Sequence, residues 1–199
     1  MHHRSYILRD PVDTDEVFLE LGKLVHEVNR VTRKGFSYSH PETRGPMQLW
    51  YWPDHFEQQS VISLVLDSMT QTTYLQVDAV SASEGEQIVA ELGKGLDFLS
   101  PDEVREEVSG NNPPTGAGLS RLGMVTNPED YDARTKDILA SALEHDDPQV
   151  RNGACAAIFL LKWPQFVPAL EDALAKETVV QIRRVLDATL QLCNGTLRI

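Results

Sequence analysis

The spacing of apolar residues predicts helices over the last third of the chain. Apolar positions there recur at i, i+4, i+7 and i+8, which is one buried stripe per helix. The stripe of Val150, Ala154, Ala157, Ile158 and Leu161 recurs thirty-two positions later as Ile182, Leu186, Thr189, Leu190 and Cys193. Upstream of each stripe, Ile138, Leu139, Ala142 and Leu143 recur thirty-one positions later as Ala169, Leu170, Ala173 and Leu174. The pattern therefore predicts two copies of a helix–turn–helix unit.

The first half of the chain shows a different pattern, in which short alternating or apolar runs are flanked by two helical segments. The predicted strands are Ser5–Arg9, Met47–Trp52, Ser60–Leu66 and Thr73–Val80, and the predicted helices begin near Asp13 and Ser83. The order β-α-β-β-β-α indicates a sandwich in which helices cover one face of a mainly antiparallel sheet. The segment 35–46 is rich in Ser, Pro, Gly and charged residues, and is expected to be a loop.

A segment rich in proline and glycine separates the two patterns. Residues 109–128 contain three prolines and four glycines with few large apolar residues, and are expected to be a linker. The sequence therefore predicts an α+β protein with a sandwich domain at 1–108, a linker at 109–128 and a helical repeat domain at 129–199. The glycines Gly116, Gly118 and Gly123 do not match a phosphate-binding loop, because no strand leads in and neither glycine spacing nor a following lysine fits.

The turn of the first helical unit resembles a known repeat. Asp146, Asp147, Pro148, Gln149, Val150 and Arg151, followed by Ala154, resemble the HEAT repeat, particularly the short HEAT-like repeats of phycobilin lyases. The second copy keeps Ile182–Arg183 but has Lys176, Glu177 and Thr178 where the Asp-Pro stood. The resemblance covers about a third of the chain and implies a short α-solenoid. In that family the arginine usually pairs with turn carboxylates of a neighbouring repeat, which is a structural role.

The charge of the chain narrows the classes of partner. A formal net charge of -12 repels phosphate backbones and anionic membranes, so nucleic-acid and membrane binding are disfavoured and a basic protein partner is favoured. No apolar run approaches the length of a membrane span, and the N-terminal residues do not form a signal peptide, so a cytoplasmic location is expected. The two cysteines, Cys155 and Cys193, are interpreted as small buried side chains.

The candidate binding residues are aromatic or acidic. Trp50 and Trp52 lie in a strand that has aromatic residues on both faces, so at least one indole is expected to be partly exposed or to pack between domains. The acidic candidates lie near the helical turns: they are Glu129, Asp130, Asp132, Asp146 and Asp147. Together these residues are predicted to contact a basic partner.

Candidate chemistry is sparse. The histidines lack companions at metal-ligand spacing, and no motif for a nucleophile, a zinc site or a cofactor is found, so no metal or cofactor is expected. Asp54 and His55 with Glu57 form the densest titratable group near a strand end, and are a weak candidate for general acid–base catalysis.

Three classes of function fit these observations. The first is a non-catalytic protein-binding module with an acidic surface, of the kind that small bacterial immunity proteins use to mask cationic toxins. The second is a scaffold or regulatory subunit of a complex. The third is an enzyme subunit similar to a phycobilin lyase, or a DNA glycosylase built of HEAT-like helices, which the negative charge disfavours.

Overall fold

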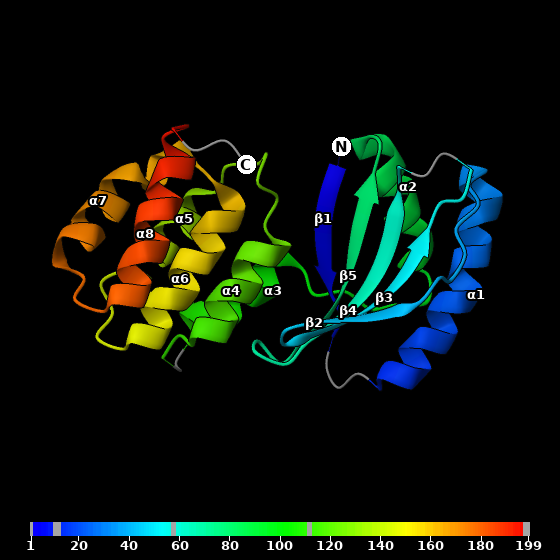
Figure 1. Ribbon diagram of the computed structural model, residues 1–199, viewed down its shortest axis with the longest axis horizontal. Helices are drawn as coiled ribbons and strands as arrows, with labels where there is room; N and C mark the ends of the chain where they lie inside the picture. The colour runs from blue at the N-terminus through cyan, green and yellow to red at the C-terminus, as the bar shows by residue number, and fades with distance from the viewer. Residues whose placement is uncertain (1, 10–12, 57–58, 111–112, 197–199) are drawn as a thin grey trace. The chain divides into compact units, whose positions relative to one another are not determined.

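A computed structural model describes residues 2–9, 13–56, 59–110 and 113–196 of the chain (Figure 1). The chain divides into two compact units, Met1–Leu99 and Ser100–Ile199. In the described part, the first unit contains one five-stranded antiparallel sheet with two α-helices, and the second contains six α-helices. The predicted α+β class is confirmed.

The sheet of the first unit has the strand order β1-β5-β4-β3-β2, with every neighbouring pair antiparallel. The strands are β1 (His2–Ile7), β2 (Pro41–Arg44), β3 (Met47–Pro53), β4 (Val61–Asp67) and β5 (Thr72–Ala79). Strand β2 lies at the edge, within the segment 35–46 that the sequence predicts as a loop. The cause of this difference is that β2 is only four residues long and its charged side chains, Glu42 and Arg44, hide any apolar alternation.

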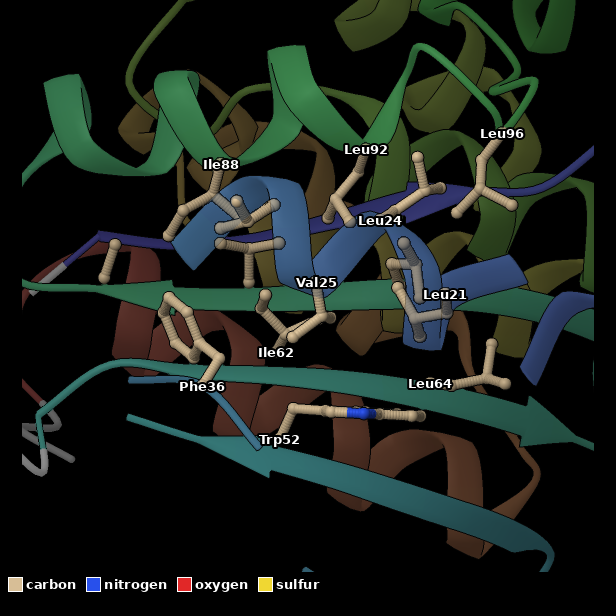
Figure 2. Packing of buried hydrophobic residues seen from close by; sticks show 14 of the residues in the cluster. Leu21, Leu24, Val25, Phe36, Trp52, Ile62, Leu64, Ile88, Leu92 and Leu96 are labelled. Carbon is tan, nitrogen blue, oxygen red and sulfur yellow. The ribbon is translucent and has the colours of Figure 1, made fainter. Parts of the chain in front are cut away.

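Helices α1 (Thr14–Thr32) and α2 (Ala82–Leu92) cover one face of this sheet (Figure 1). Asp13 caps α1 by accepting hydrogen bonds from the backbone N–H groups of Asp15 and Glu16. Because successive side chains of a strand point to opposite faces, the pairing of Trp52 with Ile62 places both on the same face. Figure 2 shows these two side chains directed toward the apolar stripes of α1 and α2.

The second unit consists of helices joined by short turns. They are α3 (Pro101–Ser109), α4 (Gly116–Val125), α5 (Ala133–Ala142), α6 (Pro148–Leu161), α7 (Val167–Lys176) and α8 (Val180–Cys193), with a single 3₁₀ turn at Pro164–Phe166. The predicted helix–turn–helix units coincide with α5/α6 and α7/α8. Of the residues in their two repeated stripes, all five on α6 and four of the five on α8 are buried.

A third helix pair, α3/α4, precedes the two predicted ones. The N-caps of α3 and α5 are Ser100 and Asp132, and those of α4, α6 and α8 are Thr115, Asp147 and Val179, so each step is thirty-two residues. Helix α4 packs against α6, and α6 packs against α8 (Figure 1). The segment 109–128 is therefore not a linker, and the boundary between the units lies at 99/100 instead of 108.

Glycine explains why the sequence pattern conceals α4. Helices α4 and α6 approach so closely that a Cβ atom on Gly116 would lie 2.3 Å from the backbone oxygen of Gln149. A Cβ on Gly123 would lie 2.5 Å from the Cα of Ala157, and one on Gly153 would lie 2.2 Å from the oxygen of Gly116. These glycines are therefore required by helix packing, although a segment rich in glycine resembles a flexible linker in composition.

Candidate functional site: the turn cleft of the helical unit

A cleft of about 620 Å³ opens where the turns of the α5/α6 and α7/α8 pairs lie side by side. We call it the turn cleft. Its lining residues are Leu143, Glu144, His145, Asp146, Pro148, Arg151, Ala173, Lys176, Glu177, Thr178 and Val179. The turn cleft thus contains residues of the HEAT-like motif together with their counterparts in the second copy.

An ion pair between Arg151 and Glu177 forms the floor of the turn cleft. Arg151 donates from Nε to Oε2 of Glu177 at 2.8 Å and from Nη2 to Oε1 at 2.9 Å, and its Nη1 donates to the carbonyls of His145 and Asp146, both at 2.9 Å. The side chain of Glu177 is only 2% exposed, and its Oε1 also accepts from the backbone N–H groups of Thr178 and Val179, each at 2.9 Å. These bonds join two consecutive turns and fix the two residues that lead into α8, a helix that has no side-chain cap of its own.

The protonation of this pair follows from its contacts. The pKa of Glu177 is lowered to about 2, chiefly by the hydrogen bonds from Arg151 and further by the backbone N–H groups of Val179 and Thr178, against the opposing effect of burial. The hydrogen bond to Glu177 raises the pKa of Arg151. Both groups are therefore charged at neutral pH and bind one another. Their role is to hold the two turns together.

The rim of the turn cleft carries the exposed charges. Asp146 is exposed, and among the described residues its carboxylate has no ion pair. Asp147 does not line the cleft itself; it is exposed between the lining residues Asp146 and Pro148, and caps α6 by accepting from the backbone N–H of Gln149 at 2.8 Å. Glu144 pairs with Lys176 at 3.3 Å, with both side chains more than 60% exposed. The rim therefore presents acidic groups that are hydrated and accessible to a cationic side chain.

The remaining acidic candidates lie at the opposite end of α5. Glu129 and Asp130 are exposed in the turn that leads from α4 to α5, and Asp132 caps α5 and forms an ion pair with Arg105 of α3. Helix α5 is ten residues long, or roughly 15 Å at the rise of an α-helix. The structure therefore separates the predicted acidic residues into two groups. Of these residues only Asp146 lines the turn cleft, and Asp147 follows it in the same turn.

Trp52 is not available to a partner, which corrects the prediction from sequence. Its side chain is 2% exposed and belongs to the core between the sheet and α1 (Figure 2). The ring packs against Phe18 and Tyr38, with centroids 5.4 and 5.5 Å away. Trp50 lies on the same face and packs partly buried against this core. The expectation that at least one indole is partly exposed therefore holds for Trp50, and only Trp52 is withdrawn as a candidate contact.

The titratable group at Asp54 also has a structural environment. Asp54 is 0% exposed, its Oδ1 accepts from the backbone N–H groups of Gly35 and Phe56, and its Oδ2 lies 3.6 Å from Nζ of Lys34. Nζ of Lys34 also lies 3.4 Å from Oε2 of Glu84, whose Oε1 accepts from Oγ of Ser60 at 2.5 Å. These groups join the end of α1 to the start of β4 and to α2. His55 is exposed, and Glu57 lies outside the described residues.

Both cysteines are buried as free thiols. Burial raises the pKa of the Cys155 thiol to about 12 and that of Cys193 to about 11. Their interpretation as small buried side chains is confirmed for burial. Within the ranges that the structure describes, no group of three or more His, Cys, Asp or Glu side chains is arranged to hold a metal ion, and no helix is long and apolar enough to cross a membrane.

Sequence reasoning missed Glu177 as the partner of Arg151. The family resemblance predicts a turn carboxylate in a neighbouring repeat, but the second copy departs from the motif at Lys176–Glu177–Thr178. The available signal was the glutamate itself, placed three residues before the first residue of a helix that has an apolar Val179 at its N-cap position.

Comparisons with protein-family models, with curated proteins and with solved structures find no match for this chain.

Proposed function

We propose that the second unit is a short HEAT-like solenoid that binds a basic protein through the acidic rim of the turn cleft, without catalysis. The observation that carries this proposal is the exposed carboxylate of Asp146 on the rim of the turn cleft, with exposed Asp147 next to it in the chain, while the arginine of the same cleft is already paired with Glu177. Because Arg151 is occupied, the rim carboxylates keep their charge for a cation from outside.

Two further features support a basic partner, and a third supports the solenoid. The chain carries a formal net charge of -12, which attracts cationic proteins and repels nucleic acids. The turn cleft is large enough to receive a lysine or arginine side chain beside the exposed Glu144. The N-caps that recur every thirty-two residues support a stack of three helix pairs, the number at which a helical repeat becomes self-sufficient.

A bacterial immunity-type role is the specific form of this proposal, since such proteins neutralise cationic toxins by charge complementarity. A cytoplasmic location belongs to the same proposal.

The test is a binding measurement in which charge at the rim is changed without loss of the helix cap. The partner is first recovered by affinity capture from the native host and purified. Asp146→Lys combined with Asp147→Ser reverses the charge at position 146 and removes that at position 147, while serine retains the ability to cap α6. Titration calorimetry is expected to show about tenfold weaker binding, and a Kd for the wild type that rises with salt concentration.

The matched control changes charge at the other end of α5. Glu129→Lys combined with Asp130→Lys alters the net charge by a similar amount, and is expected to leave the Kd within about twofold of the wild type. Equal weakening by both pairs would show that only the overall charge matters. Unchanged binding by the rim variant, or capture of an acidic partner, would overturn the proposal.

A further inference from the structure

The repeat places two arginines at equivalent positions, and the structure shows them in equivalent local poses. Arg151 and Arg183 are each the fourth residue of their helix, α6 and α8. In each case Nη1 donates to a backbone carbonyl six residues earlier, that of His145 at 2.9 Å and that of Glu177 at 3.3 Å. Both guanidinium groups are thereby fastened to the turn that precedes their helix.

The two arginines differ in the partner of the other edge of the guanidinium group, the edge formed by Nε and Nη2. For Arg151 this edge, formed by Nε and Nη2, binds the carboxylate of Glu177 from the next helix pair in a two-pronged arrangement. For Arg183, no carboxylate of the described residues lies within ion-pair distance of that edge, and the residue is exposed. The chain thus contains one filled and one open copy of the same arrangement.

The outer face of α8, the helix that carries Arg183, is polar and faces solvent. The positions of α6 that carry Cys155 and Phe159 are replaced on α8 by Asp187 and Gln191, which bond to one another at 3.0 Å. A polar outer face of this kind is typical of the last unit of a repeat array, and does not favour packing of another helix along its length. Near the start of α8, however, Arg183 and Arg184 are exposed beside Val180, whose side chain is 59% exposed.

We propose that Arg183 binds a glutamate or aspartate side chain of an acidic partner segment, in the two-pronged manner in which Arg151 binds Glu177. The occupant is identified by charge complementarity and by the filled copy, which shows what this guanidinium edge accepts. Val180 provides a small apolar contact for an aliphatic residue next to that carboxylate. This site goes beyond the acidic rim, because its sign is opposite and it lies on a different helix.

The experiment observes the arginine side chains directly in the full-length protein. The probe is a blocked peptide with the sequence of Leu174–Gln181, which contains Glu177 in its natural context, and the matched probe carries glutamine in place of that glutamate. In a ¹⁵N-labelled protein, millimolar amounts of the first peptide are expected to shift the Nε–H signal of Arg183 and to leave that of Arg151 in place. The glutamine peptide is expected to shift neither.

Two variants separate the two-pronged contact from simple attraction. Arg183→Lys keeps the charge but loses the paired donors, and is expected to weaken peptide binding about tenfold, followed through the amide signals around Val180. Arg184→Lys is the matched control and is expected to bind as the wild type does. Absence of a shift at Arg183 in the wild type, equal binding of the glutamine peptide, or equal binding by Arg183→Lys would each overturn the proposal. The Asp146→Lys variant is expected to bind the peptide normally, so the test does not depend on the acidic rim.

Discussion

Gly123 is the residue at which the packing of the helical unit is most sensitive to one added carbon. A Cβ at this position would lie 2.5 Å from the Cα and 2.7 Å from the Cβ of Ala157, which are atoms that move only if α6 moves. Gly123→Ala is therefore expected to lower the free energy of unfolding by about 1–3 kcal/mol, despite the better helix propensity of alanine. Urea denaturation of the full chain measures this change.

Gly22 provides the matched control for this substitution. It also lies within a helix, α1, but it is exposed and a Cβ there would meet nothing within 4 Å. Gly22→Ala is expected to stabilise the protein by roughly 0.5–1 kcal/mol, because alanine loses less conformational freedom than glycine. Similar effects at both positions would contradict the close approach of α4 and α6.

Glu177 links stability to pH. Its pKa is lowered from 4.5 to about 2 in the folded protein, so the stabilisation is fully present above about pH 4.5 and is lost as the pH falls toward 2. The carboxylate accepts charge-assisted hydrogen bonds from Arg151, and bonds to charged groups contribute about 1–3 kcal/mol. Glu177→Gln is expected to reduce the unfolding free energy by an amount of this order at pH 7, with a difference from the wild type that shrinks below pH 4.5.

Glu144 supplies the control for Glu177 because it also pairs with a basic residue, but with both side chains more than 60% exposed. Glu144→Gln is expected to change stability by less than about 1 kcal/mol at any pH, as exposed ion pairs contribute little. Denaturation curves collected between neutral and acidic pH compare the two variants. A deficit for Glu177→Gln that does not depend on pH would show that charge is not the cause.

At the scale of elements, α4 decides where the helical unit begins. Helix α4 packs along the face of α6 that contains Gly153 and Ala157. A fragment that begins at residue 129, as the sequence alone recommends, leaves this apolar face uncovered. A fragment of residues 100–199 keeps α3 and α4 in place.

Expression of the two fragments tests this boundary. The fragment 100–199 is expected to be monomeric and to unfold cooperatively, as followed by circular dichroism at 222 nm. The fragment 129–199 is expected to aggregate or to lose cooperativity, because it exposes the small apolar residues of α6 to water. Equal stability of both fragments would contradict the structural role assigned to α4.

The same elements show which kinds of secondary structure can be predicted from the sequence. Helices α5 to α8 are predicted from their apolar stripes, and strands β3 to β5 from short runs that are either alternating or apolar throughout. Both patterns are local properties of the chain. Helix α4 was missed because its contact surface is made of glycine, which reads as a turn former unless its neighbour is known. Strand β2 was missed because an edge strand needs no apolar alternation.

At the scale of the whole molecule, charge is the property that bears most on function. The formal net charge of -12 is a sum over the chain, so the proposal of a basic partner can be made without a structure. Where that partner would bind is a different matter. The seven predicted contact residues are dispersed in the fold: Trp52 is in the core, and the acidic residues lie at two ends of α5.

The sequence by itself determined the class of fold, the period of the helical stripes and the sign of the charge, because these depend on composition and on spacing along the chain. The tertiary structure alone decided that a glycine-rich segment is a packed helix, that Arg151 is paired with Glu177 while Arg183 has an open edge, and that Asp146 lines a cleft. Each of these depends on contacts between residues that are far apart in sequence. Local sequence patterns do not show which distant residues will come into contact.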